Sequence, residues 1–126
     1  MTAQDIYALA CSFLYEKPGQ DAAGEQFYLG FLNVLLAEAL PIENAIRLSK
    51  GLPPLASAPV LSAGTDEANC DEAIARVALP YGLASWFFQD IADYAQAENY
   101  RAKYIGALRD AAKARFVPIE DAYGGD

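Results

Sequence analysis

The sequence predicts an all-α protein, a small bundle of about four main helices with a long proline-rich loop and an extended C-terminal tail. Two observations predict this class. Apolar residues recur at spacings of three and four along most of the chain, and capping or helix-breaking residues bound these stretches. The stretch 71–115 organises the rest, because it holds two long amphipathic patterns joined at a short polar break.

The first half of this stretch predicts a core helix. Its apolar positions follow helical spacing: Ile74, Val77, Ala78, Tyr81, Ala84, Trp86, Phe87 and Ile91. Pro80 lacks a backbone donor and presses on the preceding turn, so we expect a kink or a short break near Ala78. We expect Trp86 to be the largest buried side chain of the protein.

The second half predicts a final helix of about twenty residues that ends near Arg115. Asp93 and Gln96 have the spacing of a capping box at its start. The stripe of apolar positions that follows consists of Tyr100, Tyr104, Ile105, Leu108, Ala111 and Ala112.

Two further helices are predicted before this stretch. Thr2 and Asp5 can cap the first, which ends at the turn 17–19. The second begins near Asp21 and is apolar on more than one side, so we expect it in the middle of the bundle. Pro41 is expected to interrupt this second helix.

The segment 51–70 is predicted to be an extended loop. It opens at Gly51, which suits a left-handed cap for the short helical piece before it, and prolines and small residues follow. The pair Val60 and Leu61 can form a brief strand that pairs with a partner. A loop used in assembly and a flexible surface connection both remain open. The residues expected to contact a partner are Pro53, Pro54, Val60 and Leu61.

The segment 116–126 is predicted to be a C-terminal docking tail. Its apolar residues have too little chain around them to build a core of their own. They either pack on the end of the last helix or dock on another molecule, and both interpretations stand. The docking candidates are Phe116, Val117, Pro118, Ile119 and Tyr123.

Length and composition predict one helical domain, 1–115, followed by that tail. The chain has 126 residues, of which 54% are hydrophobic, and this suits a single modest core. No uninterrupted apolar run is long enough to span a bilayer, and the N-terminus lacks a signal-peptide pattern. We therefore expect a soluble protein with no membrane partner, made and kept in the cytosol.

Residue usage disfavours catalysis and cofactor binding. The two cysteines, Cys11 and Cys70, lie far apart, and the chain has no histidine, so Cys/His zinc sites and histidine-dependent nucleophiles are excluded. Asp90 and Asp93 lie three apart and could hold a metal ion on one helix face, which is the enzyme alternative. A solvated helix end explains both acids more simply. We expect no cofactor, no metal and no enzymatic activity.

The charge is negative overall and unevenly distributed. A formal net charge of −8 argues against a free-standing nucleic-acid binder, because phosphate contacts need clustered cations. Basic residues concentrate in the predicted final helix, while 66–93 is acidic. This pattern is typical of solvated helix faces, and it also suits an acidic face of one copy meeting the basic helix of another. The candidates for contacts between subunits are Arg101, Lys103, Arg109, Asp90 and Asp93.

The order of these parts resembles the small head-to-tail connector proteins of tailed bacteriophages, the portal-adaptor or packaged-DNA stabilisation family. The similar features are the phrase AIRLSKGLPPL, the proline-rich loop, ALPYGLA at 78–84, the spacing of Tyr100 and Tyr104, and the tail ARFVPIEDAYGG. The resemblance implies a virion protein at the head-tail junction, in a ring of about twelve copies beneath the portal. DNA would pass through this ring without sequence-specific binding.

In this family the tail would reach the portal protein, and the loop would contact neighbouring copies or the next tail or head-completion component. An acidic channel wall agrees with this expectation, because it would not bind DNA through counterion release. The alternative is an acidic helical partner-binding protein, such as an antitoxin, an assembly chaperone or a DNA mimic, that forms a one-to-one complex.

Overall fold

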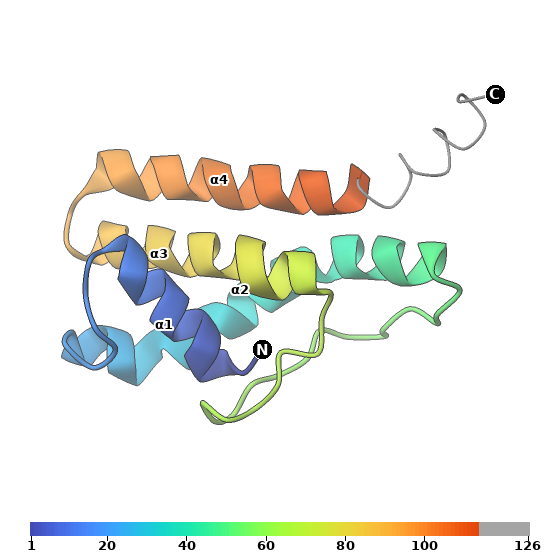
Figure 1. The fold of residues 1–126 in the computed structure, drawn as a ribbon, viewed down its shortest axis with the longest axis horizontal. Coiled ribbons are helices and arrows are strands. Elements are labelled where there is room, and N and C mark those ends of the chain that lie inside the picture. Colours follow the sequence, from blue (N-terminus) through green and yellow to red (C-terminus); the bar gives the residue numbers. More distant parts are fainter. Residues whose placement is uncertain (114–126) are drawn as a thin grey trace.

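The computed structural model describes residues 1–113, and these form an all-α bundle, as the sequence predicts (Figure 1). No strand occurs in this part of the chain. The elements are α1 (Ala3–Phe13), α2 (Ala22–Ser49), the π-helical segment η1 (Ala73–Ala78), α3 (Leu79–Asp90) and α4 (Tyr94–Lys113).

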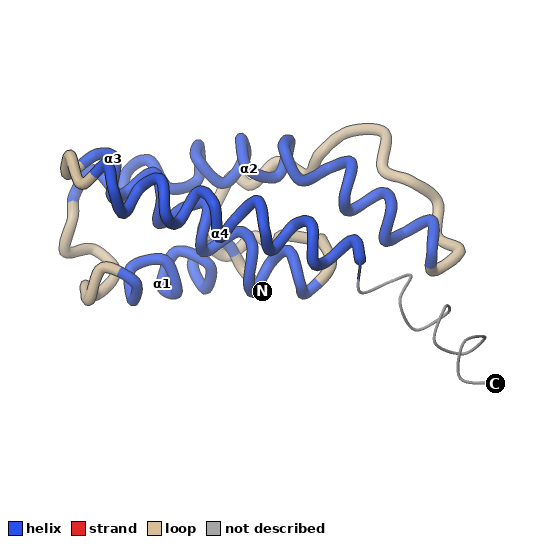
Figure 2. Tube along the Cα trace, turned by 90° about the horizontal axis from the view of Figure 1, so that it is seen from above, coloured by secondary structure: helices blue, strands red, loops and turns tan. Residues whose placement is uncertain are grey.

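Helix α3 is the centre of the bundle. It contacts α1, α2 and α4, and in the view from above α1 and α2 lie on opposite sides of the α3–α4 pair (Figure 2). The prediction that the second helix lies in the middle was therefore wrong. Eight of the twelve residues of α3 are buried, and they lie all around the helix: Leu79, Pro80, Gly82, Leu83, Ala84, Ser85, Phe87 and Phe88.

The start of α1 confirms the predicted cap. The Asp5 amide donates to the Thr2 hydroxyl over 3.3 Å, and the Thr2 amide donates to the Asp5 carboxylate over 3.1 Å. These reciprocal bonds satisfy backbone donors that the first turn of a helix leaves without partners. Hydrogen bonding to the Thr2 backbone and side chain also lowers the pKa of Asp5.

Helix α2 begins after Asp21, as predicted, and the Asp21 side chain accepts a hydrogen bond from the Ala23 amide. It continues through Pro41 without interruption for 28 residues, so the predicted break at this proline was wrong. Pro41 is exposed, and buried residues before and after it, Ala39 and Ile46, keep the helix packed on the bundle. Gly51 follows with φ of +73°, the left-handed conformation expected of it.

Pro80 disturbs the preceding turn, as predicted, but it does not break the helix. The disturbance is the π-helical segment η1, in which the Leu79 amide bonds to the carbonyl of Ile74, five residues back. A proline ring collides with the carbonyl four residues before it, here that of Arg76, and a wider turn relieves this collision. Residues 73–90 therefore form one continuous helical rod.

The loop 51–70 is tied to α2 by two asparagine side chains. Asn44 bonds to both the amide and the carbonyl of Leu55, at 2.8 and 3.1 Å, and Asn33 does the same for Leu61, at 2.7 and 3.0 Å. Leu61 is buried, so it is not available to a partner and forms no strand with Val60, which corrects that part of the prediction. Pro53, Pro54 and Val60 are exposed.

Helix α2 is long and apolar enough to cross a membrane, judged by length and composition alone. Core helices of soluble proteins and signal sequences meet the same criterion, and one face of α2 packs on α3 and α4 here. Among the described residues no other helix meets it.

Candidate functional site

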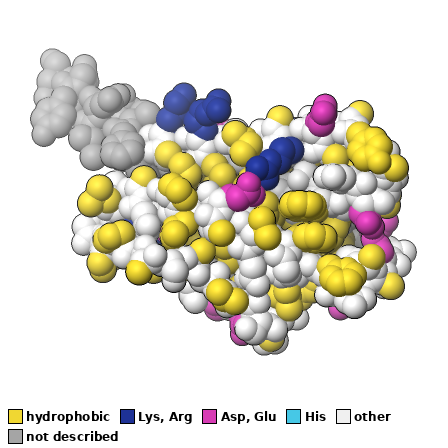
Figure 3. Space-filling model, turned by 180° about the vertical axis from the view of Figure 1, so that it is seen from behind, with side chains coloured by type: hydrophobic (Ala, Val, Ile, Leu, Met, Phe, Trp, Pro, Cys, Tyr) yellow, Lys and Arg dark blue, Asp and Glu magenta, His cyan; other side chains and the backbone are white. Residues whose placement is uncertain are grey.

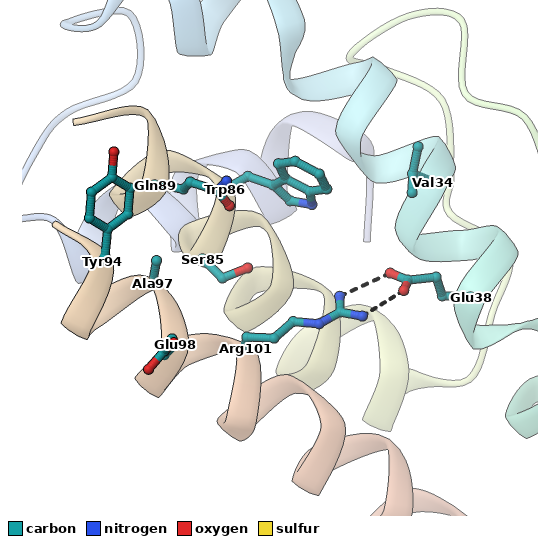
Figure 4. Close-up of a pocket in the computed structure, with 9 residues that line it drawn as sticks. All are labelled: Val34, Glu38, Ser85, Trp86, Gln89, Tyr94, Ala97, Glu98 and Arg101. Carbon is teal, nitrogen blue, oxygen red and sulfur yellow. Dashed lines mark hydrogen bonds and ion pairs between the residues drawn. The ribbon is translucent and has the colours of Figure 1, made fainter. Parts of the chain in front are cut away.

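A groove lies between α2, α3 and α4 on the described surface. Its volume is about 580 Å³, which lies within the range of ligand-binding clefts. Figure 4 shows its two walls: residues of α4 face residues of α2 across a floor formed by α3. We call it the aromatic groove, and it is lined by Val34, Glu38, Ser85, Trp86, Gln89, Tyr94, Ala97, Glu98 and Arg101.

Trp86 forms part of the groove rather than the centre of the core. Its indole stacks on Phe31 of α2 with ring centres 5.0 Å apart and planes within 3° of parallel. It is only partly buried, so the prediction that it is the largest buried side chain was wrong; that position belongs to Tyr104. The indole Nε1 is shielded from solvent and has no hydrogen-bond partner among the described residues. An unpaired buried donor is costly, and a partner that supplies an acceptor would remove this cost.

A two-pronged ion pair spans the middle of the aromatic groove. The guanidinium of Arg101 donates to both carboxylate oxygens of Glu38, at 3.0 and 2.6 Å, and joins α4 to α2 (Figure 4). These hydrogen bonds lower the pKa of Glu38 and raise that of Arg101. The same guanidinium lies 5.0 Å from the ring centre of Tyr104. Arg101 is therefore paired within its own chain, and its role between subunits stays a prediction.

Large apolar side chains surround this ion pair and remain exposed. Phe27 and Val34 of α2 are 51% and 49% exposed, and Tyr94 of α4 is 64% exposed. The space-filling view from the α2 side shows apolar side chains gathered on this face around a few charged ones (Figure 3). Contiguous exposed apolar surface on a globular protein marks a contact site. The aromatic groove therefore suits a protein surface better than a small polar ligand.

A second cluster, of charged side chains at the end of the loop, has a structural role. The buried carboxylate of Glu43 accepts from Arg47 at 2.9 Å and from the Asp71 amide at 2.6 Å, while Lys50 bonds to Asp71 at 3.0 Å. Burial raises the pKa of the neighbouring Cys70 thiol to about 12, and the negative charges of Glu43 and Asp71 add to this effect. A thiol with such a pKa is a poor nucleophile at neutral pH. The cluster clamps the loop onto α2.

The remaining charge candidates lie apart from one another. Asp90 ends α3 and is exposed, whereas Asp93 lies beyond the helix and caps α4 by accepting from the Gln96 amide at 3.2 Å. The two acids are not on one helix face, so the geometry assumed for a metal site was wrong. No group of three metal-binding side chains occurs among residues 1–113. Lys103 and Arg109 are exposed on α4, and their role between subunits stays a prediction.

The docking tail lies outside the described residues, so the expectations for Phe116, Val117, Pro118, Ile119 and Tyr123 stay predictions. Sequence reasoning missed the aromatic groove itself. A signal for it was present: Phe27, Phe31, Val34 and Glu38 recur at spacings of four and three and form a second stripe on α2. The apolar stripe suggests a centrally placed helix, but in the structure it lies on a side of α2 where Phe27 and Val34 are exposed.

Comparison with protein-family models, with curated proteins and with solved structures found no match.

Proposed function

We propose that this chain is a structural assembly protein, the head-to-tail adaptor of a tailed bacteriophage. In this proposal copies of the chain form a ring beneath the portal protein and extend the channel through which DNA passes. The observation that carries it is the aromatic groove, a hollow rimmed by large side chains that the protomer leaves exposed. Such a surface is costly in a free monomer and is stabilised when another protein covers it.

The specific assembly comes from the resemblance of the sequence to connector proteins, and the fold is compatible with it. ALPYGLA, one of the similar phrases, forms the first turns of α3, the central helix, and the end of the π-helical segment. The phrase AIRLSKGLPPL covers the end of α2 and the start of the tied loop. ALPYGLA therefore lies in the core, whereas only Ile46 of AIRLSKGLPPL is buried. In this proposal the exposed groove, the loop surface and the tail are left for partners.

The proposal is tested by co-assembly with a portal. The genes beside this one in its genome are read first, and the portal protein encoded there is co-expressed with this chain. We expect a complex with about twelve copies of the chain on one end of the portal ring, visible by electron microscopy. A chain lacking 116–126 should keep its helical circular dichroism and lose the complex, because the tail is the proposed portal contact.

A different result would favour the acidic partner-binding alternative. A gene beside a toxin, together with a one-to-one complex and no ring on the portal, would replace the adaptor proposal. The net charge of −8 is the observation that keeps this alternative in view, since strongly acidic proteins also bind basic partners.

A further inference from the structure

Helix α4 has a second hollow on its other flank. This furrow, between α4 and the rod of η1 and α3, has a volume of about 540 Å³. A Cβ atom placed on Gly106 would meet no other atom within 4 Å, so the furrow is open at that point. We call it the α4 furrow, and it is lined by Ala73, Val77, Tyr81, Lys103, Gly106, Ala107, Asp110 and Ala111.

The two hollows face in different directions. Glu98 lines the aromatic groove and Lys103 lines the α4 furrow. Five residues separate them, which turns one side chain about 140° from the other around the helix. Their charged groups therefore cannot pair within one molecule, but they can pair between two molecules.

Both charges are available for such a contact. Within residues 1–113 neither Glu98 nor Lys103 forms an ion pair; the Lys103 ammonium only lies 5.9 Å from the ring centre of Tyr81. Arg101 and Glu38 neutralise each other in the aromatic groove, so Glu98 supplies its remaining charge. Asp110 also lines the furrow, but seven residues separate it from Lys103, or about 10 Å along the axis.

The shapes of the two surfaces are also complementary. Val34 and Tyr94 line the aromatic groove and are exposed, and Phe27 is a further exposed large side chain on α2. Half of the residues that line the α4 furrow are alanine or glycine, and Val77, which also lines it, is 44% exposed. Large apolar side chains of one surface can fill a hollow walled by small ones, as in helix packing within a protein.

We propose that the occupant of the aromatic groove is a second copy of this chain, bound through its α4 furrow. In this contact Glu98 of one copy pairs with Lys103 of the next, and the exposed aromatic side chains enter the furrow. The two surfaces lie on opposite flanks of α4, so each copy can bind one neighbour on either side. Such a head-to-tail contact closes into a ring when the rotation per copy allows it. The inference rests on the proposed function, for which it supplies the contact between ring subunits.

Charge exchange between the two surfaces gives a sharp test. Self-association of the full chain is measured by sedimentation velocity at concentrations up to about 1 mM. Glu98→Lys alone and Lys103→Glu alone should each weaken association at least about tenfold, because each places like charges opposite one another. An equimolar mixture of the two variants should associate again, since every contact between unlike variants then pairs a lysine with a glutamate.

Matched variants separate the proposed contact from general effects. Arg109→Glu makes the same charge change as Lys103→Glu on the same helix, but Arg109 lines neither hollow, so association should persist. Gly106→Leu should block the furrow and reduce association. Circular dichroism of each variant checks that it folds.

A carbodiimide cross-link locates the contact directly. This reagent joins a carboxylate to a neighbouring amine, and a mixture of ¹⁵N-labelled and unlabelled chains should yield a mixed-isotope Glu98–Lys103 cross-link. A chain that stays monomeric at about 1 mM, or a two-fold dimer that the charge variants leave intact, would overturn the inference. A monomer that still binds the portal would leave the adaptor proposal standing, whereas self-association without portal binding would contradict the adaptor proposal alone.

Discussion

Burial, rather than residue type, decides what each aromatic side chain contributes to the core of this protein. Tyr104 is fully buried, and its hydroxyl donates to the Leu35 carbonyl over 3.2 Å. Burial raises the pKa of this phenol well above its usual range. Trp86, the only tryptophan, instead lies at the groove and packs on one side against Phe31. Tyr104 therefore fixes α4 on α2, and Trp86 contributes apolar surface to the aromatic groove.

Substitution by alanine should separate these two roles. Tyr104→Ala removes a fully buried ring and should lower the free energy of unfolding by about 3–5 kcal/mol. Trp86→Ala should cost less than about 3 kcal/mol, because part of the indole is already exposed and its Nε1 loses no bond. Urea denaturation followed by circular dichroism measures both. Equal losses for the two variants would place Trp86 in the core after all.

The Cys70 thiol gives a prediction at alkaline pH. Its pKa is raised in the folded protein to about 12, above the value of about 9 in an unfolded chain, so the unfolded state loses this proton first. The corresponding stability is complete below pH 9 and is lost as the pH rises towards 12. Over this window the free energy of unfolding should fall more steeply for the native protein than for Cys70→Ala, by at most about 1.4 kcal/mol per pH unit. Parallel curves for the two proteins would contradict the pKa shift.

At the scale of elements, prolines and glycines act through their surroundings. Pro41 and Pro80 both lie inside helical rods, and neither ends its helix. Pro41 is exposed, and α2 stays α-helical on both sides of it. Pro80 is buried, and a π-helical turn relieves its collision with the preceding turn. The sequence predicts a disturbance at both positions, and packing determines the form that it takes.

Gly82 sets the distance between three helices. A Cβ placed on it would lie 2.8 Å from Leu35 of α2 and 3.0 Å from Tyr104 of α4. Gly82→Ala should therefore destabilise the protein by about 1–3 kcal/mol through overpacking, despite the better helix propensity of alanine. Gly30→Ala is the matched control, because nothing lies within 4 Å of its Cβ, and it should stabilise the protein by up to about 1 kcal/mol. Thermal or urea unfolding should show opposite signs for the two changes.

In the folded molecule, the uneven distribution of acidic and basic residues along the sequence gives the two ends of the bundle different charges. The loop that joins α1 to α2 and the loop that joins α3 to α4 lie at the same end of the bundle (Figures 1 and 2). Acidic residues gather in and beside these turns: Glu16, Asp21, Glu25, Asp90 and Asp93. At the other end of α4 lie Arg109 and Lys113. Molecules with unlike ends and unlike flanks favour directional assembly over symmetric pairing.

The described bundle contains its own core, and this gives a prediction for the whole molecule. Its buried cluster is assembled from residues between Ala3 and Ala111. A chain lacking 116–126 should therefore unfold cooperatively, within about 1 kcal/mol of the full chain. Circular dichroism and urea denaturation measure this. A large loss of stability would show that the tail packs on the end of α4, which is the other interpretation of its sequence.

Local signals in the sequence determined the helices of this protein. Thr2 and Asp5, Asp21, Asp93 and Gly51 act at the ends where their spacing predicts, because a cap depends only on neighbouring backbone groups. The same holds for the turn before Pro80 and for the length of α4. The all-α class follows from these signals.

Only the tertiary structure decided which helix is central, which aromatic ring is buried and which charges are satisfied. Amphipathic spacing shows that a face is apolar, but a core residue and a groove residue give the same pattern. The burial of Leu61 by Asn33, the pairing of Arg101 with Glu38 and the exposed stripe on α2 all depend on segments that are distant in the chain. The candidate site could not be read from the sequence for the same reason: a groove is a property of three helices packed together, and no single stretch contains it.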